Sequence, residues 1–330
     1  MTAARSRREH PAIELHGVGR IYAEGGRRHT ALEDVSLTVA RGEVVGLLGE
    51  NGAGKTTLTK ILATLLLPTT GTARVLGADV VRDPTAVRAV QSVVFGGDRG
   101  LYTRLSGREN LRFFGMLDGL PHRQLTARLE PALAEVGLGE AADRKVSTYS
   151  KGMRQRLHIA IGMISRPQVL LLDEPTVGLD PLEAARLRSA VGALRADGVT
   201  VLLTSHHLLD IEELADRVVL LEQGRITRDM SVSSFAALLG YVATVIVHGT
   251  GPAPATETLD TVDTISPFTL HRSADRPDGW RLELRLARWS PQVLSALGRT
   301  LSDATLTGMD VQPARLEDAY LHHHTVRGPL

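Results

Sequence analysis

A glycine-rich octapeptide near residue 50 has the residue types that hold a phosphate group. Residues 49–56 read GENGAGKT. Glycines allow backbone N–H groups to curl inward around phosphate oxygens, and a helix that follows would present its positive N-terminus to them. Lys55 would place a point charge on the β- and γ-phosphates, and the Thr56 hydroxyl would ligate Mg²⁺. The candidate nucleotide-binding residues are Gly49, Asn51, Gly52, Ala53, Gly54, Lys55, Thr56 and the adjoining Thr57.

The octapeptide matches the P-loop pattern, although a glycine-rich turn could contain such a pattern by coincidence. Its surroundings favour the functional interpretation. The apolar run 44–48 before it predicts a buried strand, and the apolar residues between 58 and 66 predict a helix that ends before Pro68. A loop that joins a strand to a helix is the context in which the pattern holds a nucleotide, here expected to be ATP with Mg²⁺.

Two adjacent carboxylates, Asp173 and Glu174, follow the apolar run 169–172. Consecutive side chains on a strand point to opposite sides, so we expect the two to have different roles. Asp173 would hold Mg²⁺, partly through water, and Glu174 would orient or deprotonate the attacking water. Taken alone, the pair could equally be a solvated strand end. Its combination with a P-loop favours catalysis.

The composition is that of a folded soluble protein, with 43% hydrophobic and 23% charged residues among 330. The 37 acidic and 38 basic residues nearly cancel, so no overall field favours nucleic acid as a partner. No apolar run approaches the roughly 18–20 residues of a membrane-spanning helix, and the N-terminus lacks the apolar core of a secretory signal. We therefore expect a cytoplasmic protein that reaches a membrane only through a partner.

The order of predicted elements indicates an α/β nucleotide-binding fold. Short apolar runs that suit strands buried on both faces alternate with helical patterns, and we assign residues 12–240 to this domain. Residues 98–160 interrupt the alternation as a mostly helical insert. Residues 241–330 predict a small α+β accessory domain, with a half-buried strand at 280–286 and a helix that begins after Ser290.

Several further motifs carry a resemblance to the ABC ATPases. Residues 149–155 (YSKGMRQ) resemble the ABC signature, with Lys151 and Met153 in place of the usual glycine and glutamine. Residues 175–181 (PTVGLDP) look like the D-loop of that family. His206, after a predicted strand, resembles the switch histidine. The resemblance extends over about residues 12–230 and includes the fold: a P-loop NTPase domain with a helical insert.

The resemblance implies roles for individual residues. Tyr22 would stack on adenine, although a tyrosine alone is more often a core or surface residue. His206 would contact the γ-phosphate, although it could be a structural histidine, as neighbouring His207 could. Ser150 and Gly152 would contact ATP, and Ser150 would also cap a helix. Asp180 of the D-loop would complete the set of nucleotide contacts.

The resemblance also implies a mechanism. Two ATPase subunits would pair head to tail and bury two ATP molecules, each between the P-loop of one copy and the signature helix of the other. Closure on ATP and reopening after hydrolysis would move a separate transmembrane permease subunit. The pair could be a homodimer or a heterodimer with a different ATPase. The hydrolytic step requires positioning and charge stabilisation, with Glu174, His206 and Lys55 as its catalytic residues.

One position departs from the family pattern. ABC ATPases usually carry a glutamine after the strand before the helical insert, where it contacts Mg²⁺ and water, and here Gly97 occupies that place. Gln91 lies six residues earlier and would precede or begin the strand. We hypothesise that water or Asp98 takes the vacant place and that turnover is altered; a tolerated variant with normal activity is the alternative.

Two segments bear on the partner. Residues 101–111, with Phe113 and Phe114, resemble the region that docks the membrane subunit, although helical packing alone could explain part of this pattern. Residues 316–321 (LEDAYL) look like a C-terminal motif of drug-resistance exporters related to daunorubicin pumps. This favours an ABC-2 type exporter of drugs or small amphipathic molecules, peripheral on the inner face of the cell membrane. We interpret the histidines at 322–324 as a solvated tail and not as a metal site.

Two other classes of ABC protein remain as alternatives. A soluble ABC ATPase that acts on ribosomes or DNA would carry two ATPase domains or a long coiled-coil insert, and this chain has one P-loop and about 95 residues between Thr56 and Ser150. A nucleotide-binding regulator without turnover is disfavoured by Glu174, while the missing glutamine is compatible with it. A transport ATPase is therefore the favoured prediction.

Overall fold

The structure is a computed structural model, and it describes residues 10–24, 27–97, 100–238, 240–254, 265–272, 278–288 and 290–315. The chain forms two compact units, Met1–Ser231 and Val232–Leu330. Asp98, the motif at 316–321 and the histidines at 322–324 lie outside the described residues. Among the helices of the described part, none is long and apolar enough to cross a membrane.

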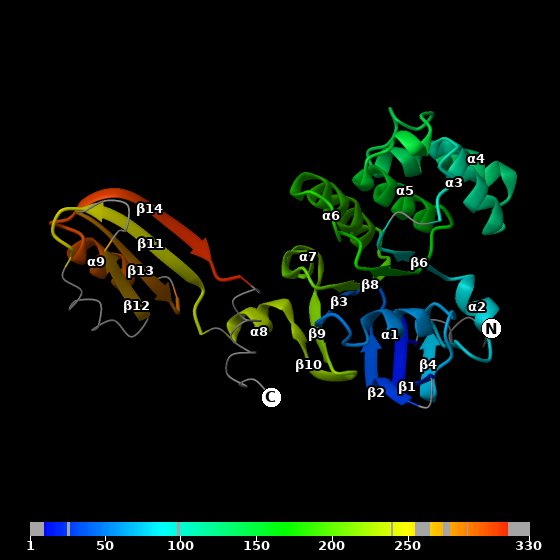
Figure 1. Cartoon of the computed structure of the whole chain (residues 1–330), viewed down its shortest axis with the longest axis horizontal. Coiled ribbons are helices and arrows are strands. Elements are labelled where there is room, and N and C mark those ends of the chain that lie inside the picture. Colours follow the sequence, from blue (N-terminus) through cyan, green and yellow to red (C-terminus); the bar gives the residue numbers. More distant parts are fainter. Residues whose placement is uncertain are drawn as a thin grey trace, which may run out of the picture. The chain divides into compact units, whose positions relative to one another are not determined.

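The first unit is built on a six-stranded sheet in the order β10-β9-β3-β8-β7-β6 (Figure 1). The strands are β3 (Val44–Leu48), β6 (Gln91–Phe95), β7 (Val169–Asp173), β8 (Thr200–Ser205), β9 (Arg217–Glu222) and β10 (Arg225–Ser231). All neighbours pair in parallel except β9 and β10. Every residue of β3, β7 and β8 is buried, which confirms the prediction of strands covered on both faces.

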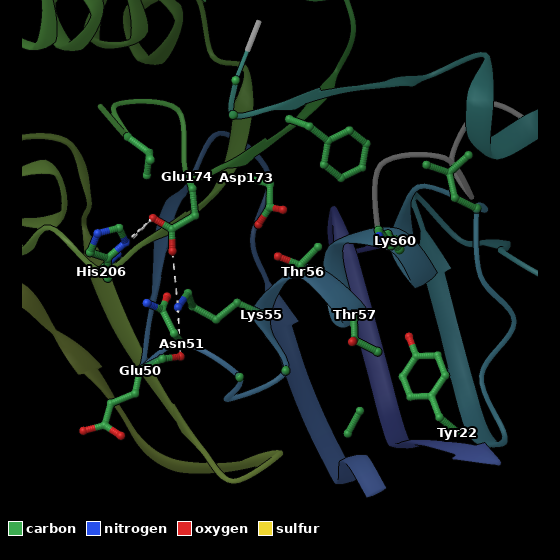
Figure 2. Close-up of a pocket in the computed structure, with 18 of the residues that line it drawn as sticks. Tyr22, Glu50, Asn51, Lys55, Thr56, Thr57, Lys60, Asp173, Glu174 and His206 are labelled. Atoms are coloured by element: carbon green, nitrogen blue, oxygen red, sulfur yellow. Dashed lines mark hydrogen bonds and ion pairs between the residues drawn. The ribbon is translucent and has the colours of Figure 1, made fainter. Parts of the chain in front are cut away.

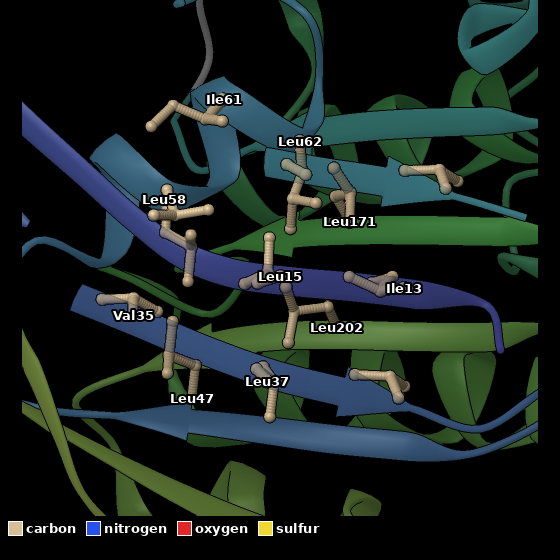
Figure 3. Close-up of a cluster of buried hydrophobic side chains, with 14 of the residues drawn as sticks. Ile13, Leu15, Val35, Leu37, Leu47, Leu58, Ile61, Leu62, Leu171 and Leu202 are labelled. Atoms are coloured by element: carbon tan, nitrogen blue, oxygen red, sulfur yellow. The ribbon is translucent and has the colours of Figure 1, made fainter. Parts of the chain in front are cut away.

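A second, antiparallel sheet has the order β2-β1-β4-β5. It consists of β1 (Ile13–Glu24), β2 (Arg27–Val39), β4 (Thr70–Val75) and β5 (Ala78–Asp79). Helix α1 (Lys55–Leu62) buries Leu58, Ile61 and Leu62 in one apolar cluster with side chains from both sheets (Figure 3). The start of α1 is therefore fixed by core packing as well as by its own backbone hydrogen bonds.

The segment between β6 and β7 is helical, as the sequence predicts. It contains α3 (Gly107–Leu117), α4 (His122–Glu135), the 3₁₀ turn η2 (Val146–Thr148) and α5 (Lys151–Ile164). Ser106 and Glu109 form a reciprocal capping box at the start of α3. The helices α2 (Pro84–Arg88), α6 (Pro181–Ala196) and α7 (Leu208–Leu214) complete the first unit.

The second unit contains an antiparallel sheet in the order β12-β13-β11-β14. Its elements are α8 (Val232–Ala237), β11 (Ala243–Thr250), β12 (Ile265–Arg272), β13 (Gly279–Leu286), α9 (Pro291–Thr300) and β14 (Thr305–Pro313). Trp280 and the three alternate leucines of β13 pack on Val293 and Leu297 of α9, whose first turn is capped by Ser290. We keep 241–330 as the proposed extent of the accessory domain, since this sheet and α9 lie after residue 240.

The buried centre of the first unit yields a stability prediction. Leu171 in β7 is fully buried in the apolar cluster, so Leu171→Ala leaves a cavity and lowers the free energy of unfolding by about 2–5 kcal/mol. Leu182 in α6 is 62% exposed, and Leu182→Ala should change the free energy of unfolding by less than about 0.5 kcal/mol. Urea denaturation followed by circular dichroism measures both; equal losses would contradict the assignment of the core.

Candidate active site

A cavity of about 980 Å³ lies where the octapeptide meets the ends of β6, β7 and β8 (Figure 2). Parallel strands deliver the residues that follow them to one edge of a sheet, and ligand sites of α/β proteins lie at that edge. The register places Leu48 beside Ser205 and Asp173 beside Thr204. Ten predicted residues line the cavity: Tyr22, Asn51, Gly52, Gly54, Lys55, Thr56, Thr57, Asp173, Glu174 and His206.

The octapeptide forms the turn between β3 and α1, in the predicted context of strand, loop and helix. Gly54 precedes α1 with φ +107°, and a Cβ there would lie 2.5 Å from the Ala31 carbonyl oxygen. Only glycine fits this position, because both the left-handed backbone and the close approach exclude a side chain. Gly49 and Ala53 do not line the cavity; a Cβ on Gly49 would meet the Leu221 carbonyl oxygen at 2.3 Å.

Lys55 carries a buried ammonium group at the base of the cavity. Its side chain is 6% exposed, and Nζ donates to the carbonyl oxygens of Gly49 at 2.6 Å and Glu50 at 3.2 Å. Nζ also lies 3.3 Å from Oε1 of Glu174. These partners hold a positive charge beside the start of α1, where the helix dipole also favours an anion. The arrangement suits a bound polyphosphate.

The two adjacent carboxylates have different partners. Asp173 is buried, and its Oδ1 accepts a hydrogen bond from the Thr204 hydroxyl at 2.6 Å. Glu174 lies just past β7 with φ +52°, so the left-handed backbone, and not strand alternation, turns its side chain away from that of Asp173. Figure 2 shows Asp173 on the side of Thr56 and Glu174 between Lys55 and His206.

Glu174 is paired with His206 as well as with Lys55. Oε2 of Glu174 lies 2.6 Å from Nδ1 of His206 and accepts from the His206 backbone N–H at 3.3 Å. The glutamate side chain is 19% exposed and the histidine side chain 37%, so both remain open to the cavity. Of the two adjacent histidines, His206 is the one that lines the cavity, while His207 stacks on it at 4.2 Å between ring centroids.

Three predicted site residues of the signature and the D-loop, Ser150, Gly152 and Asp180, do not line this cavity. Ser150 accepts from the Met153 backbone N–H at 3.1 Å at the start of α5, as predicted for an N-cap. Asp180 caps α6 in the same way, accepting from Glu183 at 2.9 Å. A Cβ on Gly152 would lie 2.5 Å from Oε2 of Glu183, so the two helix starts pack closely. Burial raises the pKa of the phenol of Tyr149, next to Ser150.

The cavity also contains residues that the sequence did not single out. His29 faces it because it is the cross-strand partner of Tyr22 in the β1–β2 pair, a register that sequence alone did not fix. Lys60 lies one helical turn after Thr56 and could have been found from that spacing. Lys151, named only as a departure from the signature, lines the cavity with its Nζ close to Gly178.

Gly97 lines the cavity with φ +106°, and a Cβ built on it would have no neighbour within 4 Å. The family's glutamine position is thus open space in this chain. Gln91 begins β6, as predicted, and its Nε2 donates to the Leu62 carbonyl oxygen at 2.7 Å. Gln91 therefore has a structural partner outside the site and does not replace the missing side chain.

Known proteins support the family to which these motifs point. The family model described as ABC transporter matches residues 32–177. The chain is 42% identical over 214 residues to the ABC transporter ATP-binding protein NatA of Bacillus subtilis, covering 65% of this chain and 87% of that protein. It is 36% identical over 314 residues to the daunorubicin resistance ATP-binding protein DrrA3 of Streptomyces coeruleorubidus, covering 94% of this chain and 95% of that one.

Solved structures give the same result for the fold. A structure described as the ATP binding subunit of an ABC transporter superposes with a TM-score of 0.61 at 30% identity, covering 69% of this chain and 93% of that chain. CbiO1 from Clostridium perfringens, part of the ABC transporter complex cbiONQ, superposes with a TM-score of 0.63 at 26% identity, covering 69% of this chain and 92% of that chain. The chain belongs to the ABC transporter family, as one of its ATP-binding proteins.

Proposed function

We propose that this chain hydrolyses ATP and that hydrolysis drives a separate transmembrane subunit of an ABC-2 type exporter. The observation that carries the proposal is the position of the Glu174 carboxylate, 3.3 Å from Lys55 Nζ and 2.6 Å from His206 Nδ1 at the edge of the cavity. A carboxylate beside a phosphate-binding lysine is suited to orient a water molecule for attack on the terminal phosphate.

Each residue of the site has a role in this reaction. Lys55 and the backbone N–H groups of the octapeptide bind the phosphates and offset the charge that develops on the terminal one. Glu174 positions the attacking water and accepts its proton. His206 contacts the terminal phosphate and holds Glu174 in place. Tyr22, which lines the cavity, would pack against the base, as the family resemblance implies.

The donor set fits Mg²⁺. Thr56 supplies a hydroxyl and Asp173 a carboxylate, and Mg²⁺ prefers one or two such oxygens together with phosphates and water. Among the described residues, no group of three or more histidine, cysteine, aspartate or glutamate side chains could hold a metal alone. Bound there, Mg²⁺ would neutralise phosphate charge.

The signature residues imply a second ATPase subunit. Ser150 and Gly152 stand at the start of α5 and Asp180 at the start of α6, and none of them lines the cavity that contains Lys55. Their contact with ATP, which the family resemblance implies, therefore requires another copy or a related ATPase. An anion at the start of α5 would meet the free N–H groups of a helix N-terminus.

An aromatic cluster on the helical insert is the proposed docking region for the membrane subunit. Tyr102 and Phe113 pack edge to face with ring centroids 4.8 Å apart, and Phe114 contacts both. Tyr102 is 50% exposed and Leu117 66%, whereas Leu111 is fully buried and serves only packing. Exposed aromatic and aliphatic side chains on one segment are typical of a protein interface.

Arg108, in the same segment, has a local role within the helical insert. Its Nε lies 2.7 Å from Oδ1 of Asp143, and Nη1 contacts Glu130. The hydrogen bond from Arg108 lowers the pKa of Asp143. Charge reversal at Arg108 would place three acidic groups together and disturb the insert itself, so a loss of transport in that variant would not report on docking.

The relatives supply the proposed direction and location. Several are named as daunorubicin or doxorubicin resistance ATP-binding proteins, including one from Streptomyces peucetius that is 38% identical over 290 residues. Export of drugs or other small amphipathic molecules is therefore the proposed process. The ATPase would act at the inner face of the cell membrane, where ATP is present. A regulator that binds ATP without turnover is the second candidate, favoured by the open space at Gly97.

Glu174→Gln tests the proposed reaction. The amide cannot accept a proton from water, so we expect ATP turnover to fall by about 100-fold or more, while ATP binding persists and an ATP-bound dimer accumulates. A steady-state phosphate-release assay with Mg²⁺ measures turnover, and light scattering measures the dimer. Glu213→Gln, an exposed carboxylate change on α7, is the control and should keep normal turnover. Wild-type turnover in Glu174→Gln would exclude the proposed base.

Gly97→Gln tests the missing glutamine. Any residue with a Cβ at φ +106° strains the backbone, so Gly97→Ala is the matched control that carries the strain without the amide. We expect the glutamine variant to differ from the alanine variant in ATP turnover or in its dependence on Mg²⁺ concentration. Identical turnover and metal dependence in the two variants would show that the vacant place has no effect on hydrolysis.

Tyr102→Ser tests docking. Loss of an exposed ring weakens an interface with the membrane subunit but leaves the cavity intact, so transport should fall several-fold at unchanged ATPase activity of the isolated chain. Drug efflux from cells that also express the permease measures transport, and phosphate release measures the ATPase activity of the isolated chain. Normal efflux in Tyr102→Ser and in Leu117→Ser would remove the aromatic cluster as the docking region.

A further inference from the structure

A buried carboxylate that belongs to none of the family motifs lies behind the active site. Asp210, in the first turn of α7, is 1% exposed. Its Oδ2 accepts hydrogen bonds from the hydroxyls of Thr176 and Ser205, the latter at 3.0 Å. Its Oδ1 accepts from Nη1 of Arg188 in α6 at 3.1 Å. One side chain therefore joins four segments of the first unit.

Two of the partners of Asp210 stand next to the proposed catalytic side chains. Thr176 is two residues after Glu174, in the loop that leaves β7. Ser205 ends β8 and directly precedes His206. The Ser205 hydroxyl also accepts the backbone N–H of His207 at 2.9 Å, so it fixes the chain on both sides of His206.

The backbone at Glu174 needs such support. Its φ of +52° is in the left-handed region, which costs a non-glycine residue roughly 1–2 kcal/mol. The Glu174 N–H donates to the Thr204 carbonyl oxygen at 3.0 Å, which fixes the loop at its start. The Thr176–Asp210 hydrogen bond holds the same loop two residues later. A strained conformation persists when contacts on both sides determine it.

We propose that Asp210 is a positioning residue for hydrolysis. It ties the loop of Glu174 to the end of β8 and so sets the contact between the Glu174 carboxylate and the His206 ring. This inference rests on the proposed function, in which these two side chains act on the terminal phosphate. Asp210 itself is buried behind the loops and does not line the cavity that would hold ATP.

The placement predicts an effect on turnover and not on binding. The octapeptide joins β3 to α1, and Lys55 Nζ donates its hydrogen bonds to the carbonyl oxygens of Gly49 and Glu50 within that turn. Loss of Asp210 would thus leave the phosphate-binding loop intact while the Glu174–His206 contact loosens. A displacement of about 1 Å in a catalytic group can lower a rate by on the order of 100-fold.

Asp210→Asn is the principal test, made in the full chain. We expect kcat for ATP to fall about 10- to 100-fold, with the dissociation constant for ATP within about threefold of wild type. Glu213→Gln is the matched control, because Glu213 is the other carboxylate bound to Arg188, at 2.5 Å from Nε, and its side chain is 46% exposed. An equal fall of kcat in both variants would overturn the proposal.

A second readout follows the contact itself. The ring nitrogens of His206, assigned in ¹H–¹⁵N spectra with a His206→Gln variant, should change resonance in Asp210→Asn and stay unchanged in Glu213→Gln. This measurement does not depend on turnover. If the wild type hydrolyses no ATP, the proposed function fails, while an altered His206 resonance would still support positioning. An unaltered resonance together with unaltered kcat would overturn it.

Thr176→Val and Ser205→Ala keep the test decisive if Asp210→Asn does not fold. Each removes one hydroxyl from Asp210 and leaves its pairing with Arg188. We expect each single variant to lower kcat. The fold-reduction of kcat in the double variant should be smaller than the product of the two single fold-reductions, because both hydroxyls act through one carboxylate. Independent, multiplicative effects would contradict a shared positioning role.

Discussion

Glu174 lies between a buried lysine and a histidine. The rest of the first unit must hold these three side chains, which come from distant parts of the chain, at fixed positions. Lys55 Nζ is 3.3 Å from one carboxylate oxygen and His206 Nδ1 is 2.6 Å from the other. Along the chain, Glu174 lies 119 residues after Lys55 and 32 residues before His206. The Lys55 ammonium and the Glu174 carboxylate attract each other strongly only where water is partly excluded, so the fold must fix the positions of these side chains.

The parallel sheet provides that fixation. β3, β7 and β8 are fully buried neighbours whose carboxyl ends stand in register, so each delivers one of the three side chains to the same edge. The apolar cluster that joins α1 to both sheets fixes the helix that begins with Lys55. Behind this edge, the buried carboxylate of Asp210 connects the loops that follow β7 and β8. Core packing and catalytic geometry therefore depend on the same strands.

Much of this arrangement could be predicted from sequence because its signals are local. The octapeptide, the apolar runs of the strands and the Ser150 cap each lie within a few neighbouring residues, and the structure has them as predicted. The left-handed backbone of Glu174 and the approach of His29 to Tyr22 have no local signal, because they arise from contacts between distant segments. The same holds for Asp210 and for Arg108, whose partners come from other helices and loops.

The most direct test of the account is a crystal structure of the Glu174→Gln variant with Mg²⁺ and ATP. We expect the triphosphate on the backbone N–H groups of residues 49–56, with Lys55 on the terminal phosphates and Thr56 on the metal. We also expect a water molecule between residue 174 and the terminal phosphate, with His206 beside it. A nucleotide bound elsewhere, or a residue 174 turned away from the terminal phosphate, would contradict the central role given to this carboxylate.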